Sequence, residues 1–226
     1  MPEAGKPFKS TKLYDVAAAL PLVALYGWAV AKDWPGLKAG FAALGEEGGA
    51  EVVAGAAGRA LSLVFAGLVI VLVLVRTVPV RKSTGILPRA VALLGAGGGA
   101  AILLLPAARL PIVLDLAAIV IVFAGLAGTI ASLIWLWRSF SILPEARQLV
   151  TSGPYRIVRH PVYAFEEIAL FGVMLQFVQP WAFLLFVLQV GFQLARMHLE
   201  ERVLEDAFPR YADYAARTPR LVPGFC

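Results

Sequence analysis

Six stretches of mainly apolar residues, each close to the length needed to cross a bilayer, constrain this chain more than any other feature. A transmembrane helix needs roughly 20 predominantly apolar residues, within a range of about 17–25. The candidate spans are residues 16–31, 60–75, 90–105, 112–137, 162–178 and 181–199. With 60% hydrophobic and 15% charged residues, the chain also lies outside the composition of soluble domains. We therefore predict an all-α, polytopic transmembrane helical bundle of about six spans.

Basic residues alternate between the two sides of these spans and predict an orientation. Lys and Arg outnumber Asp and Glu in the N-terminal tail and in the second and fourth loops, and four arginines follow the last span. Because cytoplasmic segments carry this excess, both termini are predicted to be cytoplasmic. The first loop, residues 33–58, is predicted to be a partly helical, glycine-broken segment on the outer face. The single cysteine, Cys226, excludes a disulfide framework within the chain and a Cys-rich zinc site.

The glycines of the third span have a packing interpretation. Residues 95–99 contain four glycines, but no strand precedes them and no Lys-Ser or Lys-Thr pair follows, as a phosphate-binding loop requires. Small residues instead let helices approach closely in lipid. We expect the first four spans to act as a packing scaffold.

Ionisable residues gather at the predicted start of the fifth span and the predicted end of the sixth. The first group is Arg159, His160, Glu166 and Glu167, and the second is Arg196, His198, Glu200 and Glu201. Because Gln179 and Pro180 form a tight turn between these spans, the two helices are predicted to be antiparallel neighbours. Both groups then lie at one cytoplasmic level. Ionisable groups at membrane depth are costly and usually face a site or a partner, so this meeting point is the predicted functional site.

Each of these residues also has a purely structural interpretation. Arg156 is suited to reach lipid phosphates from the interface. Glu200 is suited to a solvated helix in which it pairs with Arg196 at i,i+4 spacing, and His160 before Pro161 is suited to a helix start. An aromatic belt at the interface would account for Tyr155, Tyr163, Tyr211 and Tyr214. It is the coincidence of the two groups that favours a function.

Two sequence motifs resemble those of a known superfamily. GPYRIVRHPVY, at residues 153–163, is similar to the GPYxxxRHPxY signature of the isoprenylcysteine carboxyl methyltransferase and phospholipid methyltransferase superfamily. EERVLEDAFPRYADYAARTPRLVP, at residues 200–223, resembles its C-terminal pattern of paired glutamates, a phenylalanine, spaced tyrosines and Arg-x-Pro-Arg. The resemblance covers about residues 135–225, and the order and spacing of the two motifs make it specific. The wider segment 138–161 is similar to bacterial members.

This resemblance implies an integral membrane methyltransferase that uses S-adenosylmethionine. It implies a cofactor site made by the last two helices and the cytoplasmic C-terminal segment, with a lipophilic substrate entering from the bilayer. The cofactor-binding candidates carried over are Leu149, Val150, Gly153, Tyr155, Arg159, His160, Tyr163, Glu200 and Glu201. The candidate catalytic residues are Glu201, Arg196 and Tyr163, and neither a metal site nor a nucleic-acid partner is expected. We expect one membrane domain over residues 1–226, with a scaffold at 1–137 and a methyltransferase-like core at 138–226, in a bacterial inner membrane.

The chemistry of these side chains suits the implied cofactor. Arg159 and His160 can hold its carboxylate through charge-assisted hydrogen bonds. Glu200 and Glu201 can accept hydrogen bonds from its ammonium group or its ribose hydroxyls. The Tyr163 ring can face its sulfonium in a cation–π contact. The acceptor is either the carboxylate of a prenyl-cysteine-like compound, which needs no base at pH 7, or the amine of a lipid headgroup. An amine would need a general base, for which Glu201 and His160 are the candidates.

The chain departs from the superfamily pattern directly after RHPxY. Residues 164–167 read Ala-Phe-Glu-Glu where a small residue or glycine is common. Because Glu167 lies one helical turn after Tyr163, it is predicted to line the pocket. Two other functions stay open: a membrane reductase of the steroid-reductase type, and a non-catalytic membrane scaffold.

Overall fold

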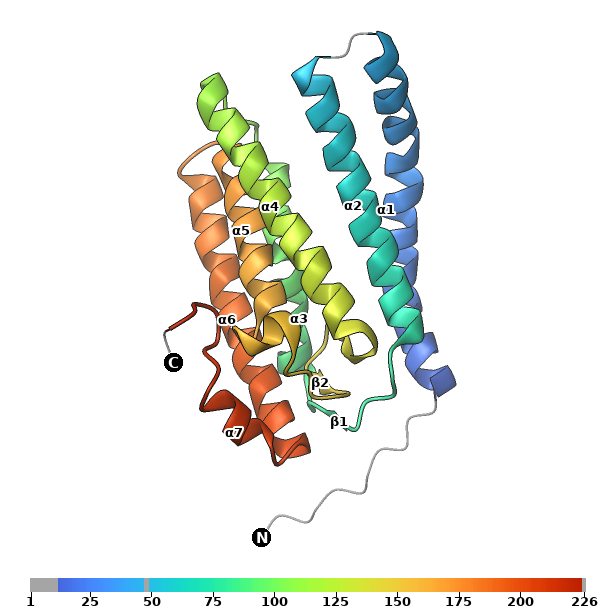
Figure 1. Cartoon of the computed structure of the whole chain (residues 1–226), viewed down its shortest axis with the longest axis vertical. Coiled ribbons are helices and arrows are strands. Elements are labelled where there is room, and N and C mark those ends of the chain that lie inside the picture. Colours follow the sequence, from blue (N-terminus) through green and yellow to red (C-terminus); the bar gives the residue numbers. More distant parts are fainter. Residues whose placement is uncertain (1–11, 47–48, 225–226) are drawn as a thin grey trace.

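The structure, a computed structural model, describes residues 12–46 and 49–224 and is a bundle of long helices with one small sheet at one end (Figure 1). The elements are α1 (Lys12–Glu46), α2 (Ala50–Val75), β1 (Arg81–Lys82), α3 (Ile86–Gly97), the 3-10 helix η1 (Gly98–Leu104), α4 (Ile112–Leu136), η2 (Trp137–Ser139), β2 (Glu145–Ala146), η3 (Gly153–Arg156), α5 (Pro161–Leu175), α6 (Trp181–Ala207) and α7 (Tyr211–Ala215). The predicted all-α polytopic bundle is confirmed.

Four helices of the described chain are long and apolar enough to cross a membrane. They are Val52–Val75, Ile86–Leu104, Ile112–Ser139 and Trp181–Ala207. These correspond to the second, third, fourth and sixth predicted spans, and the chain is therefore an integral membrane protein. α5 has 15 residues, a length of about 22 Å, and α1 carries prolines at positions 21 and 35. The count of six stays a prediction for these two helices.

Residues 33–46 and 50–58 are helical, which is more helix than the partly helical, glycine-broken segment predicted there. α1 continues to Glu46 and α2 begins at Ala50. A Cβ atom added to Gly40 would lie 3.3 Å from the Cβ of Ala56, so the glycine lets the two helices approach closely. Arg59 Nη1 of α2 also donates to the Gly36 carbonyl of α1 at 2.6 Å. Packing along a neighbouring helix thus outweighs the weak helix propensity of this segment.

The glycines of the third span behave as predicted. α3 ends at Gly97, and the chain continues as the tighter η1 helix from Gly98. A Cβ atom on Gly95 would lie 3.1 Å from Gln193 Oε1 of α6, and one on Gly99 would lie 2.7 Å from the Leu170 side chain of α5. Both glycines therefore allow close packing against the helices that carry the predicted site.

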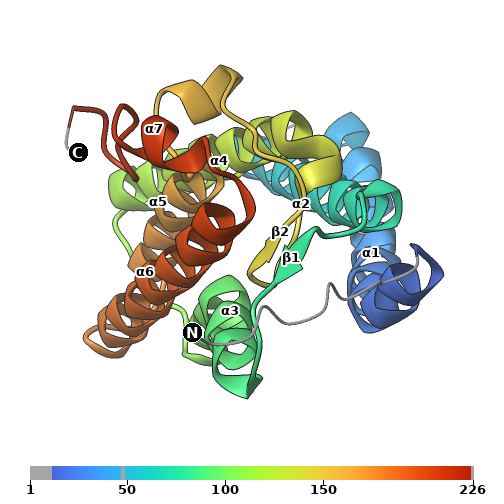
Figure 2. The same cartoon turned by 90° about the horizontal axis from the view of Figure 1, so that it is seen from below.

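The long helices pack in pairs, and α4 belongs with the C-terminal helices. α1 lies along α2, α3 along α6 and α4 along α5, while the contact between α5 and α6 is smaller (Figures 1 and 2). Gly125 of α4 faces the backbone of Ala169, where an added Cβ would lie only 2.3 Å from the amide nitrogen. A Cβ atom on Gly128 would instead lie 2.2 Å from the ring of the Phe165 side chain. α4 therefore fixes the position of α5.

Polar segments gather at one end of the bundle, which we call the polar end. It holds the start of α1, the β1–β2 pair, η3, the end of α6 and α7 (Figure 1). β1 and β2 are antiparallel, with Lys82 paired to Glu145, and lie between the α1–α2 pair and the other helices (Figure 2). The side of the membrane that this end faces stays a prediction.

Candidate active site

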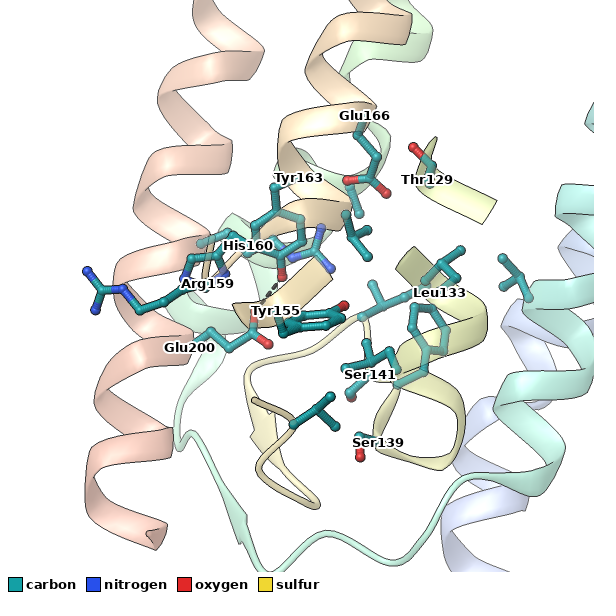
Figure 3. Close-up of a pocket in the computed structure, with 18 of the residues that line it drawn as sticks. Thr129, Leu133, Ser139, Ser141, Tyr155, Arg159, His160, Tyr163, Glu166 and Glu200 are labelled. Atoms are coloured by element: carbon teal, nitrogen blue, oxygen red, sulfur yellow. Dashed lines mark hydrogen bonds between the residues drawn. The ribbon is translucent and has the colours of Figure 1, made fainter. Parts of the chain in front are cut away.

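A cavity of about 350 Å³ extends from the polar end into the bundle and receives side chains from all six long helices. Its polar wall includes Glu145, Arg147, Tyr155, Arg159, His160, Tyr163, Glu166, Arg196 and Glu200. Its apolar wall includes Tyr26, Phe65, Val69, Leu126, Leu133, Ala169 and Leu170. Figure 3 shows Tyr155, Tyr163 and Glu200 close together, with Glu166 and Thr129 further along. The volume and the mixture of polar and apolar walls suit a small-molecule site.

Glu201 joins the two sequence motifs at a buried cluster of charges. Its Oε1 lies 3.1 Å from both Arg159 Nη1 and His160 Nε2. Its Oε2 accepts from Arg220 Nη2 at 2.6 Å and Nε at 3.0 Å. The Glu201 side chain is only 4% exposed. Both carboxylate oxygens are therefore occupied, and Glu201, which is absent from the cavity wall, orients groups that line it.

Backbone hydrogen bonds hold the C-terminal segment against the same loop. The amide of Arg159 donates to the Pro219 carbonyl at 2.8 Å, and the amide of His160 donates to the Arg220 carbonyl at 3.0 Å. Pro161 then occupies the first turn of α5, where its missing N–H costs nothing. The sequence predicted that residues 159–161 meet the C-terminal segment. Both main-chain and side-chain hydrogen bonds hold the two together.

Tyr163 lies at the centre of the polar wall. Its hydroxyl donates to Glu200 Oε2, and its ring stacks on His160 with a centroid distance of 5.2 Å and an interplanar angle of 6°. The Arg196 guanidinium lies over the Tyr163 ring, 4.6 Å from the centroid. The ring therefore already has a cation over it. A sulfonium contact with this ring stays a prediction, and Arg196 competes for it.

Glu166 is the carboxylate that lies deepest in the cavity wall. Gln193 Nε2 donates to Glu166 Oε2 at 2.8 Å, and Gln193 Oε1 accepts from Arg196 Nη1 at 3.3 Å. Glu167 is not part of this wall, so its predicted position is wrong. Glu166 and Glu167 follow Tyr163 by three and four positions, so they lie on the same face of α5 as Tyr163 but on either side of it. α5 is rotated so that Glu166, and not Glu167, points to the cavity. Neither oxygen of Glu167, both buried, accepts a hydrogen bond within the described chain.

The loop before α5 supplies part of the polar wall. Leu149, Val150 and Tyr155 line the cavity, whereas Gly153 does not. Gly153 has φ of +58°, and an added Cβ would lie 2.1 Å from the Trp135 indole. Its role in the structure is therefore to form a turn against α4. The cofactor roles of all these residues stay predictions.

The sequence analysis missed a buried ionic network beside the cavity. Arg147 donates to Asp15 through Nη2 at 2.9 Å and Nη1 at 3.1 Å, and to Glu145 at 2.6 Å. Arg76 Nε donates to Asp15 Oδ2 at 2.9 Å. The Asp15 side chain is 1% exposed, and Arg147 and Glu145 line the cavity. The only signal in the sequence was one acidic residue just before the first span.

Three buried tyrosines complete the polar end. Burial raises the pKa of Tyr155 and Tyr211 well above 10, and it raises the pKa of Tyr214 to about 12. The Tyr214 hydroxyl donates to the Tyr155 carbonyl at 2.5 Å. These phenols are therefore neutral at physiological pH, and the Tyr214 hydroxyl acts as a hydrogen-bond donor. Within residues 12–46 and 49–224, no group of three or more His, Cys, Asp or Glu side chains is placed to hold a metal ion.

Known proteins resemble the part of the chain that carries this site. Residues 112–210 match the phospholipid methyltransferase family. Protein-S-isoprenylcysteine O-methyltransferase B of Arabidopsis thaliana is 37% identical over 93 residues, which cover 38% of this chain and 47% of that protein. The resemblance to this superfamily is thus confirmed for the C-terminal part of the chain. The match begins at the first residue of α4, earlier than the predicted core at 138.

Two bacterial proteins are also similar to part of this chain. The cobalt-zinc-cadmium resistance protein CzcN of Cupriavidus metallidurans is 40% identical over 80 residues, or 33% of this chain and 35% of that protein. The nickel-cobalt-cadmium resistance protein NccN of Alcaligenes xylosoxydans xylosoxydans is 35% identical over 106 residues, which cover 44% of this chain and 48% of that protein. The chain therefore spans half or less of the length of the curated relatives it matches.

Proposed function

We propose that this protein transfers a methyl group from S-adenosylmethionine to a lipophilic acceptor that reaches the cavity from the membrane. The observation that carries the proposal is one cavity with two unlike walls. Its polar wall holds the RHPxY residues of a methyltransferase family, and its apolar wall is formed by helices at membrane depth. A soluble, charged cofactor and a lipophilic acceptor need such a pair of walls.

The residues of the polar wall fit the cofactor. Arg159 and Tyr211 line the cavity. The buried Arg159 Nε and Tyr211 hydroxyl make no hydrogen bond of good geometry within the described chain, although the two side chains interact with each other. Unsatisfied buried donors are costly, and the carboxylate or ribose oxygens of the cofactor would satisfy them. Glu200 would accept from its ammonium or ribose. Leu149 and Val150 would contact its adenine.

The apolar wall fits the acceptor. Tyr26 and Phe65 come from α1 and α2, and their rings meet edge to face with centroids 6.1 Å apart. Leu126 and Thr129 of α4 also line the cavity, and Figure 3 shows Thr129 near Glu166. A hydrocarbon chain placed between these helices would direct its polar end to Tyr163 and Arg196.

The chain would promote the transfer mainly by alignment and by exclusion of water. When bound, the cofactor supplies an activated methyl group and a neutral thioether leaving group. The walls would hold donor and acceptor in line, which accounts for much of the rate enhancement in two-substrate reactions. For an acceptor that must lose a proton, Glu166 has the better position, since the oxygens of Glu201 are occupied by Arg159, His160 and Arg220.

Calorimetric titration of the purified protein tests this proposal. S-adenosylhomocysteine is expected to bind at micromolar level, and NADPH is not. Glu200→Gln should weaken S-adenosylhomocysteine binding roughly 10- to 100-fold, the usual effect of losing a hydrogen bond to a charged group. Glu166→Gln, on the acceptor side, is the matched control and should change the affinity by less than about threefold. Binding of NADPH without S-adenosylhomocysteine would instead establish the reductase alternative.

A further inference from the structure

Three arginines outside the cavity of the candidate active site converge on a second concavity at the polar end. It has a volume of about 550 Å³ and lies between the segment around η3 and the segment around α7. Arg156 comes from the first segment, and Arg210 and Arg217 come from the second. Thr151 and Thr218 complete its polar lining. Residues more than 50 positions apart are thus brought to one place.

No carboxylate of the described residues lies within ion-pair distance of these three arginines. None of the described residues that line the concavity is acidic. None of the three arginines takes part in an ion pair within residues 12–46 and 49–224. Arg217 Nε donates to the Asp213 carbonyl at 3.0 Å, which leaves its terminal nitrogens for another partner. Like charges held close together repel one another, so the arrangement favours an anion.

Aromatic side chains mark the level of this concavity relative to the membrane. Trp135 and Trp137, at the end of α4, are 52% and 46% exposed. Trp135 Nε1 donates to Ser152 Oγ at 3.1 Å, and Ser152 directly follows Thr151 of the concavity. Exposed tryptophans at the end of a spanning helix lie at the headgroup level of the bilayer. Ile157, next to Arg156, is 60% exposed, as expected of a side chain that reaches the acyl boundary.

We propose that this concavity binds the phosphate group of an anionic phospholipid from the adjoining leaflet. Guanidinium groups bind phosphate in a bidentate manner, and the threonine hydroxyls add neutral donors. The proposal does not depend on the methyltransferase function. Leu149 and Tyr214 line both this concavity and the active-site cavity, so the bound lipid would border the candidate active site.

Native mass spectrometry of the detergent-purified protein tests this site. The probes are phosphatidylglycerol, phosphatidylcholine and inorganic phosphate, and the test variant is Arg156→Gln/Arg210→Gln/Arg217→Gln. Each basic residue near an anionic surface contributes roughly a fivefold change in affinity. We therefore expect phosphatidylglycerol to bind more tightly than phosphatidylcholine. The affinity of the triple variant for phosphatidylglycerol should be lower on the order of 100-fold.

A second triple variant removes the same charge elsewhere. Arg89, Arg109 and Arg202 are exposed, and none has an ion pair within the described chain, so replacing all three with Gln is the matched control. The affinity of this control variant for phosphatidylglycerol should fall by less than about fivefold. Both triple variants should keep the helicity and elution volume of the unmodified protein. Equal losses in the two variants would overturn the proposal, because only net charge would then matter. So would equal binding of the two lipids, or binding of inorganic phosphate without phosphatidylglycerol, which would assign the site to a soluble ligand.

Discussion

Removing the charge of Glu201 should destabilise the protein far more than removing that of its exposed partner Arg220. The Glu201 side chain is 4% exposed, and its partners Arg159 and His160 are 12% and 6% exposed. Glu201→Gln leaves these groups buried without a counter-charge, and breaking a buried pair in this way costs about 3–5 kcal/mol. Arg220 is 54% exposed, so solvent screens its ion pair, and Arg220→Gln should cost less than about 1 kcal/mol.

Thermal unfolding of the two variants in the same detergent measures this difference. For a chain of this size, 1 kcal/mol corresponds to about 2–4 °C in Tm. Glu201→Gln should therefore lower Tm by about 6–20 °C, and Arg220→Gln by less than about 4 °C. Similar shifts for the two variants would refute the reasoning, because they would show that the Arg159 and His160 contacts contribute little.

Three further predictions follow from the packing and the buried polar groups. Asp15→Asn should lower the free energy of unfolding by about 3–5 kcal/mol, measured by the same melting assay, since it leaves two buried arginines without their carboxylate. Gly125→Ala should cost about 1–3 kcal/mol because its Cβ would meet the Ala169 backbone, whereas Gly67→Ala, with open space, should be neutral or stabilising; equal effects would contradict the close α4–α5 contact. The pKa of Tyr214 is raised to about 12 in the folded state from 10. Its contribution to stability is therefore present below pH 10 and is lost between pH 10 and 12. The phenolate absorbance of Tyr214, taken as the difference between the protein and Tyr214→Phe, should then rise together with loss of helicity, and a rise well before that loss would disprove this link.

Local sequence signals were enough to predict much of the bundle. The end of α2 at Val75, the start of α4 at Ile112 and the start of α6 at Trp181 coincide with predicted span limits. Hydrophobic runs and a proline turn act over short distances, so one sequence contains them. The meeting of the His160 and Glu201 groups followed from the same turn, and it is observed at 3.1 Å.

The features that the sequence did not predict depend on long-range packing. The helical segment after residue 33 needs the partner surface of α2, which no local pattern describes. The Asp15–Arg147 ion pair joins residues 132 positions apart. The choice between Glu166 and Glu167 depends on how α5 rotates against α4, a rotation fixed by the glycine contacts of α4. The role of Arg220 depended on where the C-terminal segment turns back.

Photo-cross-linking tests the central claim, that the polar wall of the cavity binds S-adenosylmethionine. The protein would be irradiated with S-adenosylmethionine labelled in its methyl group, digested and mapped by mass spectrometry. The account predicts label in the peptides that carry residues 149–163 and 196–211, and its loss with excess S-adenosylhomocysteine. Label confined to other peptides, or unchanged by that competitor, would contradict the account.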